Sequence, residues 1–351
     1  MKLHRLEAVR GFAATYVVAH HTLPHDLVVL GFNIGFLLRF GQEAVILFFL
    51  LSGFVINYSY RSKPLKPSEY FFNRFCRIYI PLLAAFLLSY GVAAAASGRT
   101  IDIDLAGLLG NLFMLQDISS LKPGVIVEPY MGNLPLWSLS YEWWFYVMYV
   151  PIMSYLGSWK SRSILVLLLA CICATLYSWY PLWILRIGFY FSIWWCGALL
   201  AVPSPTGPAN HARDALALLI CCFGILFVGA WHSGSLSASH LGTHPVLELR
   251  HFLSAIFFVL FALAWQRAGW RGFRFLLSPF AILAPISYSL YILHAPLHRL
   301  LSPLSLQVGF FAAEAGFIVL LIVLGSLVEL WIYPNAKRYL LGLRAAKSTV
   351  I

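Results

Sequence analysis

The stretch RGFAATYVVAHH, residues 10–21, has an arginine and two histidines at the ends of an apolar run that predicts one transmembrane helix. His21 lies eleven positions after Arg10, which in an α-helix is about 16 Å of rise and roughly 20° more than three full turns. The two side chains therefore share one face, whereas His20 lies about a quarter turn away. Ionisable residues inside a bilayer usually face a cavity, a pathway or a partner, although a snorkelling anchor also explains Arg10.

Composition places this helix in a polytopic membrane protein. The 351 residues are 61% hydrophobic and 11% charged, which is too apolar for an ordinary soluble domain. Apolar runs of about 17 to 25 residues recur, each long enough to cross a bilayer as a helix, and the alternating pattern of a membrane β-barrel is absent. We therefore predict an all-α transmembrane bundle that forms a single domain over residues 1–351. The predicted spans lie near residues 9–30, 41–59, 78–97, 134–157, 163–180, 183–202, 214–231, 251–267, 280–299 and 308–333.

The distribution of charge predicts the orientation of the bundle. The chain has 24 lysines and arginines and a formal net charge of +11, and basic residues accumulate in the cytoplasmic loops of membrane proteins. With ten spans and both termini in the cytoplasm, most basic residues fall on that side, so we predict an integral protein of the inner membrane. The weaker apolar run 105–118 then becomes a re-entrant or interfacial helix, which is tolerated only where protein covers its backbone. Because topology accounts for the charge, nucleic-acid binding does not follow from it.

Neither the cysteines nor the N-terminal sequence changes this interpretation. The six cysteines show no metal-ligand spacing, so we predict small buried thiols and no metal cofactor. Val17 and Ala19 loosely fit a signal-peptidase site. Cleavage there would separate Arg10 from His21, and we favour a retained first helix.

Further polar residues interrupt the second and fourth spans. Ser52-Gly53 suits close helix packing, or the close approach of a substrate to the backbone. Glu142 shares a face with Ser138 and Tyr146, because each lies four residues away. A carboxylate in lipid needs a partner or water, and an interfacial belt of neighbouring tryptophans does not explain the acid.

A basic loop and the ninth span carry the remaining candidates. Arg74 and Arg77 project from one helical face and offer planar forks of donors that suit phosphate. Attraction to lipid headgroups explains the same pair. In the ninth span, Ser287 and His294 are seven residues apart and share a face, with Tyr291 near it.

Together these stretches resemble the acyltransferase family 3 membrane proteins. Members carry an arginine and a histidine separated by ten residues in the first helix, a phenylalanine pair before Ser-Gly, an Arg-x-x-Arg loop, a Trp-Ser-Leu-x-x-Glu element and a late Ser-Tyr-x-x-Tyr-x-x-His. The matching residues are Arg10 and His21, Phe48, Phe49, Ser52 and Gly53, Arg74 and Arg77, Trp137 to Glu142, and Ser287 to His294. Each motif alone is weak, but five in this order are specific, and they favour His21 over His20.

The chain departs from the family pattern in two places. Ile46 and Leu47 stand where members often have an acidic residue, and Glu43 lies one turn earlier. Ile80 is inserted before Pro81 in the entry to the third span. Both departures concern local geometry rather than the family. The fused extracytoplasmic hydrolase-like domain of some members is not expected here.

The resemblance implies transfer of an acyl group, usually acetyl, from cytoplasmic acyl-coenzyme A to a hydroxyl on an extracytoplasmic glycan or related acceptor. It implies that Arg10, Arg74 and Arg77 hold the coenzyme A. In direct transfer, His21 takes the proton of the acceptor hydroxyl and Glu142 orients or charges the imidazole. In the rival route, an acyl-histidine intermediate carries the group across.

Substrate contacts are expected from Ser52, Trp137, Tyr291 and His294. The donor is acetyl-coenzyme A or another acyl-coenzyme A. The acceptor stays open between a polysaccharide, a lipopolysaccharide, a nodulation-type oligosaccharide, peptidoglycan, a periplasmic glucan and a macrolide. We expect the outer segment 98–133 to set acceptor specificity, as loops often do. Its acidic residues are Asp102, Asp104, Asp117 and Glu128.

A proton-coupled transporter of a small substrate is the competing interpretation. Arg10, His21, Glu142 and His294 would then line a proton or substrate pathway. That class predicts inverted repeats with broken helices, and the sequence shows none. A non-catalytic membrane sensor would explain the spans but not the ionisable groups.

Overall fold

The computed structural model describes residues 2–29, 31–203 and 209–348, and this part of the chain is almost entirely helical. The α-helices are α1 (Lys2–Thr22), α2 (Gly41–Ser62), α3 (Pro67–Ser97), α4 (Leu105–Leu112), α5 (Trp137–Tyr155), α6 (Trp159–Tyr177), α7 (Trp183–Leu200), α8 (Ala209–His232), α9 (Val246–Arg267), α10 (Phe273–Leu276), α11 (Ser287–Leu301), α12 (Ser305–Val308), α13 (Phe310–Ser326) and α14 (Tyr333–Ser348). The strands β1 (Val28–Val29) and β2 (Phe32–Asn33) pair antiparallel. Shorter 3₁₀ segments include η1 (Gly35–Leu38), η2 (Tyr130–Gly132), η3 (Leu134–Leu136) and η5 (Ser278–Ile286), and η7 (Leu327–Ile332) is a π-helix. The predicted all-α class is confirmed.

Eight helical segments of the described chain are long and apolar enough to cross a membrane. Helices α1 and α5 have similar lengths, at 21 and 19 residues, but their polar side chains lower their hydropathy. Helix α1 carries Arg5, Glu7 and Arg10, and α5 is rich in tryptophan, tyrosine and serine. The two long helices that fall outside the apolar set both carry predicted site residues, Arg10 and His21 on α1 and Trp137 and Glu142 on α5. The count of ten spans stays a prediction.

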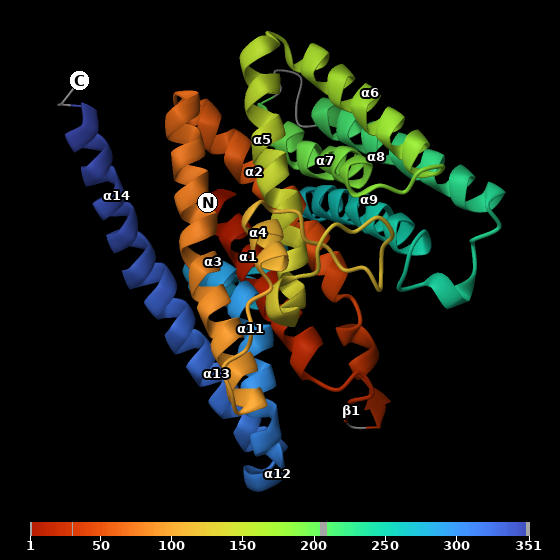
Figure 1. Ribbon diagram of the computed structural model, residues 1–351. Helices are drawn as coiled ribbons and strands as arrows, with labels where there is room; N and C mark the ends of the chain where they lie inside the picture. Colours follow the sequence, from red (N-terminus) through yellow and green to blue (C-terminus); the bar gives the residue numbers. More distant parts are fainter. Residues whose placement is uncertain (1, 30, 204–208, 349–351) are drawn as a thin grey trace.

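The bundle has two distinct ends, which we name by their loops (Figure 1). The basic end contains the turn from α2 to α3, with Arg61, Lys63 and Lys66. Helix α14 also reaches this end, since the guanidinium of Arg344 lies 5.4 Å from the ring centroid of Phe72, near the start of α3. The hairpin end contains β1 and β2, at the bottom of Figure 1. Site residues are placed below relative to these two ends.

The last helices form one long rod. Helices α13, η7 and α14 follow one another without a break from residue 310 to residue 348, which is about 58 Å of helix at 1.5 Å per residue. The hydrocarbon core of a bilayer is about 30 Å thick. Helix α14 therefore continues as far as the basic end, at the left of Figure 1.

Helices α2 and α7 cross at a pair of glycines. A Cβ atom at Gly53 would overlap the backbone carbonyl oxygen of Trp194, and one at Gly197 would overlap that of Leu50. Only residues without a side chain allow this approach. The packing role proposed for Gly53 is therefore the one that the structure supports.

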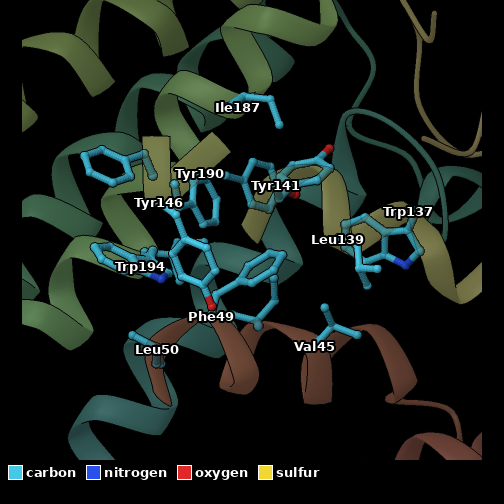
Figure 2. Close-up of a cluster of buried hydrophobic side chains, with 14 of the residues drawn as sticks. Val45, Phe49, Leu50, Trp137, Leu139, Tyr141, Tyr146, Ile187, Tyr190 and Trp194 are labelled. Carbon is cyan, nitrogen blue, oxygen red and sulfur yellow. The ribbon is translucent and has the colours of Figure 1, made fainter. Parts of the chain in front are cut away.

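An aromatic core fills the space between α2, α5 and α7 (Figure 2). The ring of Phe49 lies 5.9 Å from that of Tyr141 and 5.2 Å from that of Phe145, between centroids. The ring of Tyr141 lies 5.2 Å from that of Tyr190 on α7. Large rings packed in this way fix the rotation of α5 about its own axis, because no partner can turn without displacing the others.

Helix α4 dips into the bundle and does not cross it. Its eight residues span about 12 Å, far less than a bilayer. The hydroxyl of Tyr90 donates to the carbonyl of Ile101, and that of Tyr79 donates to Leu112, so the segment runs back along α3. The side chain of Asn111 donates to the carbonyl of Glu128 at 2.8 Å. Such internal partners supply the backbone cover that a re-entrant segment requires.

A group of buried charges, here called the Asp117 cluster, fixes the chain between α4 and α5. Its members Asp117, Lys122, Tyr141 and Arg186 are all 2% exposed or less. Lys122 Nζ donates to Asp117 Oδ1 at 2.9 Å, and the hydroxyl of Tyr141 donates to Asp117 Oδ2 at 2.6 Å. Arg186 Nη2 also lies 2.9 Å from Oδ2. Burial alone would raise the pKa of Asp117, but the Lys122 and Arg186 charges hold that pKa below its usual value.

The Asp117 cluster corrects one expectation about the outer segment 98–133. Asp117 was expected among the residues that set acceptor specificity. Its carboxylate is instead enclosed by protein groups and has partners on both oxygens. Asp102 and Asp104 are exposed, so they remain open to a ligand.

Candidate active site

A cavity of about 210 Å³ opens among α1, α2, α3, α5 and α11. Its polar lining residues are Glu7, Arg10, Ser52, Arg74, Arg77, Ser138, Glu142, Tyr146, Ser287, Tyr288 and Tyr291. The apolar lining includes Phe48 and Phe49. The structure thus brings together six predicted site residues from five separate helices, namely Arg10, Ser52, Arg74, Arg77, Glu142 and Tyr291. We call this space the arginine cavity.

Glu142 lines the arginine cavity, and its carboxylate accepts hydrogen bonds from hydroxyl groups. Ser52 Oγ donates to Glu142 Oε1 at 2.8 Å, and the hydroxyl of Tyr146 donates to the same oxygen. Trp194 Nε1 donates to Ser52 Oγ at 3.2 Å. These partners stabilise an acid that would otherwise be costly inside the bundle. Within the described chain, Glu142 Oε2 has no hydrogen-bond partner, which leaves it for a ligand.

Two arginines of the cavity keep unused donors. Arg10 Nη2 donates to the carbonyl of Ala284 at 2.9 Å, and its Nε is buried with no partner among the described residues. The guanidinium of Arg74 lies 5.8 Å and 5.7 Å from the ring centroids of Tyr70 and Tyr146. Its Nε also has no partner in the described chain. Planar guanidinium groups with free donors are suited to phosphate.

Arg77 is held differently from its neighbour Arg74. It forms an ion pair with Glu329 in the π-helical turn η7, and its guanidinium lies 5.2 Å from the ring centroid of Tyr288. Ser289 Oγ donates to the other oxygen of Glu329 at 3.2 Å. Because a carboxylate already compensates its charge, Arg77 has less to offer an anion than Arg74.

Two histidines meet near the hairpin end, and we call them the histidine pair. The ring centroids of His21 and His294 are 4.9 Å apart. His21 Nδ1 lies 2.9 Å from the carbonyl oxygen of Val17, and His294 Nδ1 lies 3.2 Å from that of Leu290. A nitrogen that faces a carbonyl must carry a hydrogen, so in each neutral ring Nε2 holds the lone pair. His21 is exposed, whereas His294 is fully buried.

Tyr291 connects the histidine pair to the arginine cavity. Its ring lines the cavity, and its centroid lies 6.2 Å from that of His294, one turn further along α11. Its hydroxyl is 2.8 Å from Ser138 Oγ, which lies one turn before Glu142 on α5. A continuous path of polar and aromatic groups therefore runs from Glu142 to His21.

Comparison with known proteins identifies the family. Residues 3–333 match the family model described as "Acyltransferase domain". The chain belongs to this acyltransferase family. It is also similar to the acyltransferase MdmB of Streptomyces mycarofaciens, with 31% identity over 154 residues. That match covers 42% of this chain and 38% of the relative. No solved structure matches the chain.

Membership of an acyltransferase family argues against the transporter interpretation. The residues that match the family motifs do not all line the arginine cavity. His21, His294 and Trp137 are not among the described residues that line the arginine cavity. Helix α1 ends at Thr22, and the ring of His20 packs on Gly41, the first residue of α2. His21 therefore lies near the hairpin end, further from the middle of the bundle than the helical spacing alone suggested.

Glu142 and Trp137 have other partners than the sequence suggested. The hydrogen bonds of Glu142 within the described chain go to Ser52 and Tyr146, and it is the carbonyl of Val17 that orients His21. Trp137 packs against the Asp117 cluster, with Lys122 Nζ 3.6 Å from its ring centroid.

The sequence did not predict the roles of Glu329 and Tyr288 beside the arginine cavity. Glu329 pairs with Arg77 from 252 positions further along the chain. Glu329 is one of two acids in the apolar run 308–333, with Glu314, and an acid in such a run is a signal of the same kind as Glu142. Tyr288 is part of the late motif, but its ring contact with Arg77 depends on tertiary packing. Among the residues that the structure describes, no group of three or more His, Cys, Asp or Glu side chains is arranged to hold a metal.

Proposed function

We propose that this acyltransferase moves an acyl group, with acetyl the expected one, from acyl-coenzyme A to a hydroxyl of a carbohydrate or related acceptor. The arginine cavity and the histidine pair carry the proposal. Guanidinium groups suit the phosphates of coenzyme A, and imidazole lone pairs suit the proton of a hydroxyl. The two lie on either side of Tyr291, so donor and acceptor would meet there.

The donor enters from the basic end. Arg74 and Arg77 lie in the first third of α3, which starts at that end. Lysine and arginine mark the cytoplasmic side of membrane proteins, which supports an inner-membrane protein with the basic end and both termini in the cytoplasm. Coenzyme A has phosphates at one end and the thioester at the other. With its phosphates at Arg10 and Arg74, the thioester would lie deeper, beside Ser52 and Glu142.

The transfer step needs a base and a path for one proton. The acceptor hydroxyl gives its proton to Nε2 of His21, and its oxygen attacks the thioester carbonyl carbon. The tetrahedral intermediate collapses, the carbon–sulfur bond breaks, and the imidazolium returns the proton to the leaving thiolate. The products are an ester and free coenzyme A. His294, with a buried Nε2 that has no partner in the described chain, would hold the acceptor beside His21.

Glu142 serves the donor in this scheme. Its Oε1 fixes Ser52 and Tyr146, and its Oε2 would accept from an amide N–H of the pantetheine arm. That contact would hold the thioester at one depth in the arginine cavity. The acceptor is expected to be extracytoplasmic, because the histidine pair lies near the hairpin end.

The test is consumption of acetyl-coenzyme A labelled in the acetyl group by membranes that contain the protein. The expected result is release of free thiol and transfer of label to a glycan fraction, and a pure transporter would give neither. Label trapped on His21 without acceptor would replace direct transfer by the acyl-histidine route. Mass spectrometry of surface glycans from cells with and without the protein would identify the acceptor.

A further inference from the structure

The arginine cavity ends at two aromatic rings. Phe48 on α2 and Tyr291 on α11 both line it, whereas His294 and His21 are not among the described lining residues. The centroids of the Phe48 and Tyr291 rings are 5.9 Å apart, with an angle of 59° between their planes. Rings at this separation are in contact. Because the ring centroid of Tyr291 is also 6.2 Å from that of His294, the two rings lie on the side of the cavity that faces the histidine pair.

The two rings are not held equally firmly. Tyr291 is 6% exposed, and its hydroxyl bonds to Ser138 at 2.8 Å. Phe48 is half-buried, and its neighbour Phe49, not Phe48 itself, is wedged into the aromatic core. Phe48 is thus the ring that can turn aside, while Tyr291 keeps its place.

We propose that Phe48 and Tyr291 form an acyl-length filter that restricts the donor to acyl groups of a few carbons. The inference rests on the proposed function, because it concerns the same thioester. For the carbonyl carbon to come within reach of a hydroxyl held by the histidine pair, the acyl group must enter between the two rings. An apolar opening of this kind accepts a short hydrocarbon and rejects a longer one by overlap.

The size of the effect follows from the behaviour of apolar pockets. One methylene more than a pocket admits costs about 10-fold to 200-fold in kcat/KM. A wild-type filter would therefore separate acetyl-coenzyme A from butyryl-coenzyme A by at least about tenfold. Removal of the Phe48 ring would leave room for the longer chain. It would also admit water, and so raise thiol release in the absence of acceptor.

The experiment measures kcat/KM for acetyl-, butyryl- and hexanoyl-coenzyme A in membranes that contain the full chain. Phe48→Ala is expected to raise the butyryl-to-acetyl ratio at least about tenfold. Phe54→Ala is the matched control, because Phe54 is a half-buried phenylalanine of the same helix whose ring stacks on Tyr58. The control is expected to keep the wild-type ratio.

Two further variants keep the test decisive if Phe48→Ala does not fold. Phe48→Trp places a larger apolar ring at the filter and is expected to lower the butyryl-to-acetyl ratio. Tyr291→Phe keeps the buried ring and with it the width of the filter, so it is expected to leave the ratio unchanged although it loses the bond to Ser138. An unchanged ratio in both Phe48 variants, with acetyl transfer still measurable, would overturn the filter and leave the proposed function standing. If the wild-type protein consumes no acyl-coenzyme A, the proposed function fails and the filter fails with it.

Discussion

The Asp117 cluster and the arginine cavity bury charged groups on neighbouring faces of α5, yet they use them in opposite ways. In the cluster, Asp117 has partners on both carboxylate oxygens, and Lys122 and Arg186 both form ion pairs with it. In the cavity, Arg10 and Arg74 keep donors that have no partner in the described chain. Buried charges whose hydrogen-bonding atoms all have partners stabilise a fold, whereas charges with unpaired donors beside a cavity are available to a ligand. Substitutions in the two regions should therefore have different consequences.

The largest expected effect is on the chemistry. His21→Ala removes the proposed base and should lower transfer by about 100-fold to 10 000-fold. Because the side chain is exposed, the temperature of unfolding should change little. Thiol release and unfolding in detergent are measured together, with the exposed His232 replaced by alanine as the control. Near-normal transfer in His21→Ala, with loss in His20→Ala, would move the site to the neighbouring histidine.

The next effect is on stability, in the Asp117 cluster. Asp117→Asn leaves Lys122 and Arg186 without their shared anion and should lower the free energy of unfolding by about 3 to 5 kcal/mol. Thermal unfolding in detergent measures it. The control is Asp102→Asn, an exposed acid in the same segment. If both variants unfold at the same temperature, the cluster does not hold the segment between α4 and α5.

A smaller effect is expected on donor binding. Arg74→Ala removes charge-assisted hydrogen bonds to phosphate, about 1.5 to 3 kcal/mol, and should raise KM for acyl-coenzyme A by roughly 10-fold to 150-fold. The exposed Arg61 gives the control variant Arg61→Ala. Arg77→Ala should instead lower stability, since it leaves Glu329 buried without its partner. An equal loss of donor and acceptor binding in Arg74→Ala would indicate a structural role for Arg74.

The smallest effect compares two serines of α5. Ser138→Ala removes one hydrogen bond to Tyr291, about 0.5 to 1.5 kcal/mol, and should lower kcat/KM by no more than about tenfold. Ser140 faces the other way, and its hydroxyl donates to the carbonyl of Gln116 at 2.8 Å. Ser140→Ala should therefore lower stability and leave kcat/KM unchanged. A loss of activity in Ser140→Ala and of stability alone in Ser138→Ala would contradict the assignment of Ser138 to the site and of Ser140 to the fold.

Helical spacing predicted the all-α bundle, and motif order predicted six of the residues that line the cavity. The hydrogen bonds of Glu142 with Ser52 and Tyr146 show which contacts a sequence can predict and which it cannot. The Tyr146 contact is local, at four positions, and was predicted as a shared face. The Ser52 contact joins two helices, and only their packing determines it.

The position of His21 shows a second limit of the sequence. The spacing from Arg10 gave the correct face of α1, because that depends on helix geometry alone. The depth of the residue depends on where neighbouring helices begin, and α2 begins at the level of His20. The partner of Arg77 could not be assigned for the same reason, since Glu329 comes from a turn 252 positions away.

The π-helical turn η7 makes the C-terminal helix tolerant of the loss of one residue. A π-turn contains about one residue more than an α-turn, so deleting one residue between Leu327 and Ile332 would restore a regular α-helix. The α-turn that remains covers nearly the same rotation as the π-turn it replaces, so α14 would keep its orientation relative to α13. Arg344 would therefore stay beside Phe72, whereas the residues of the turn itself, Glu329 among them, would shift relative to Arg77. Loss of one residue in this turn can thus alter the charge beside the arginine cavity without substituting any of the described residues that line it.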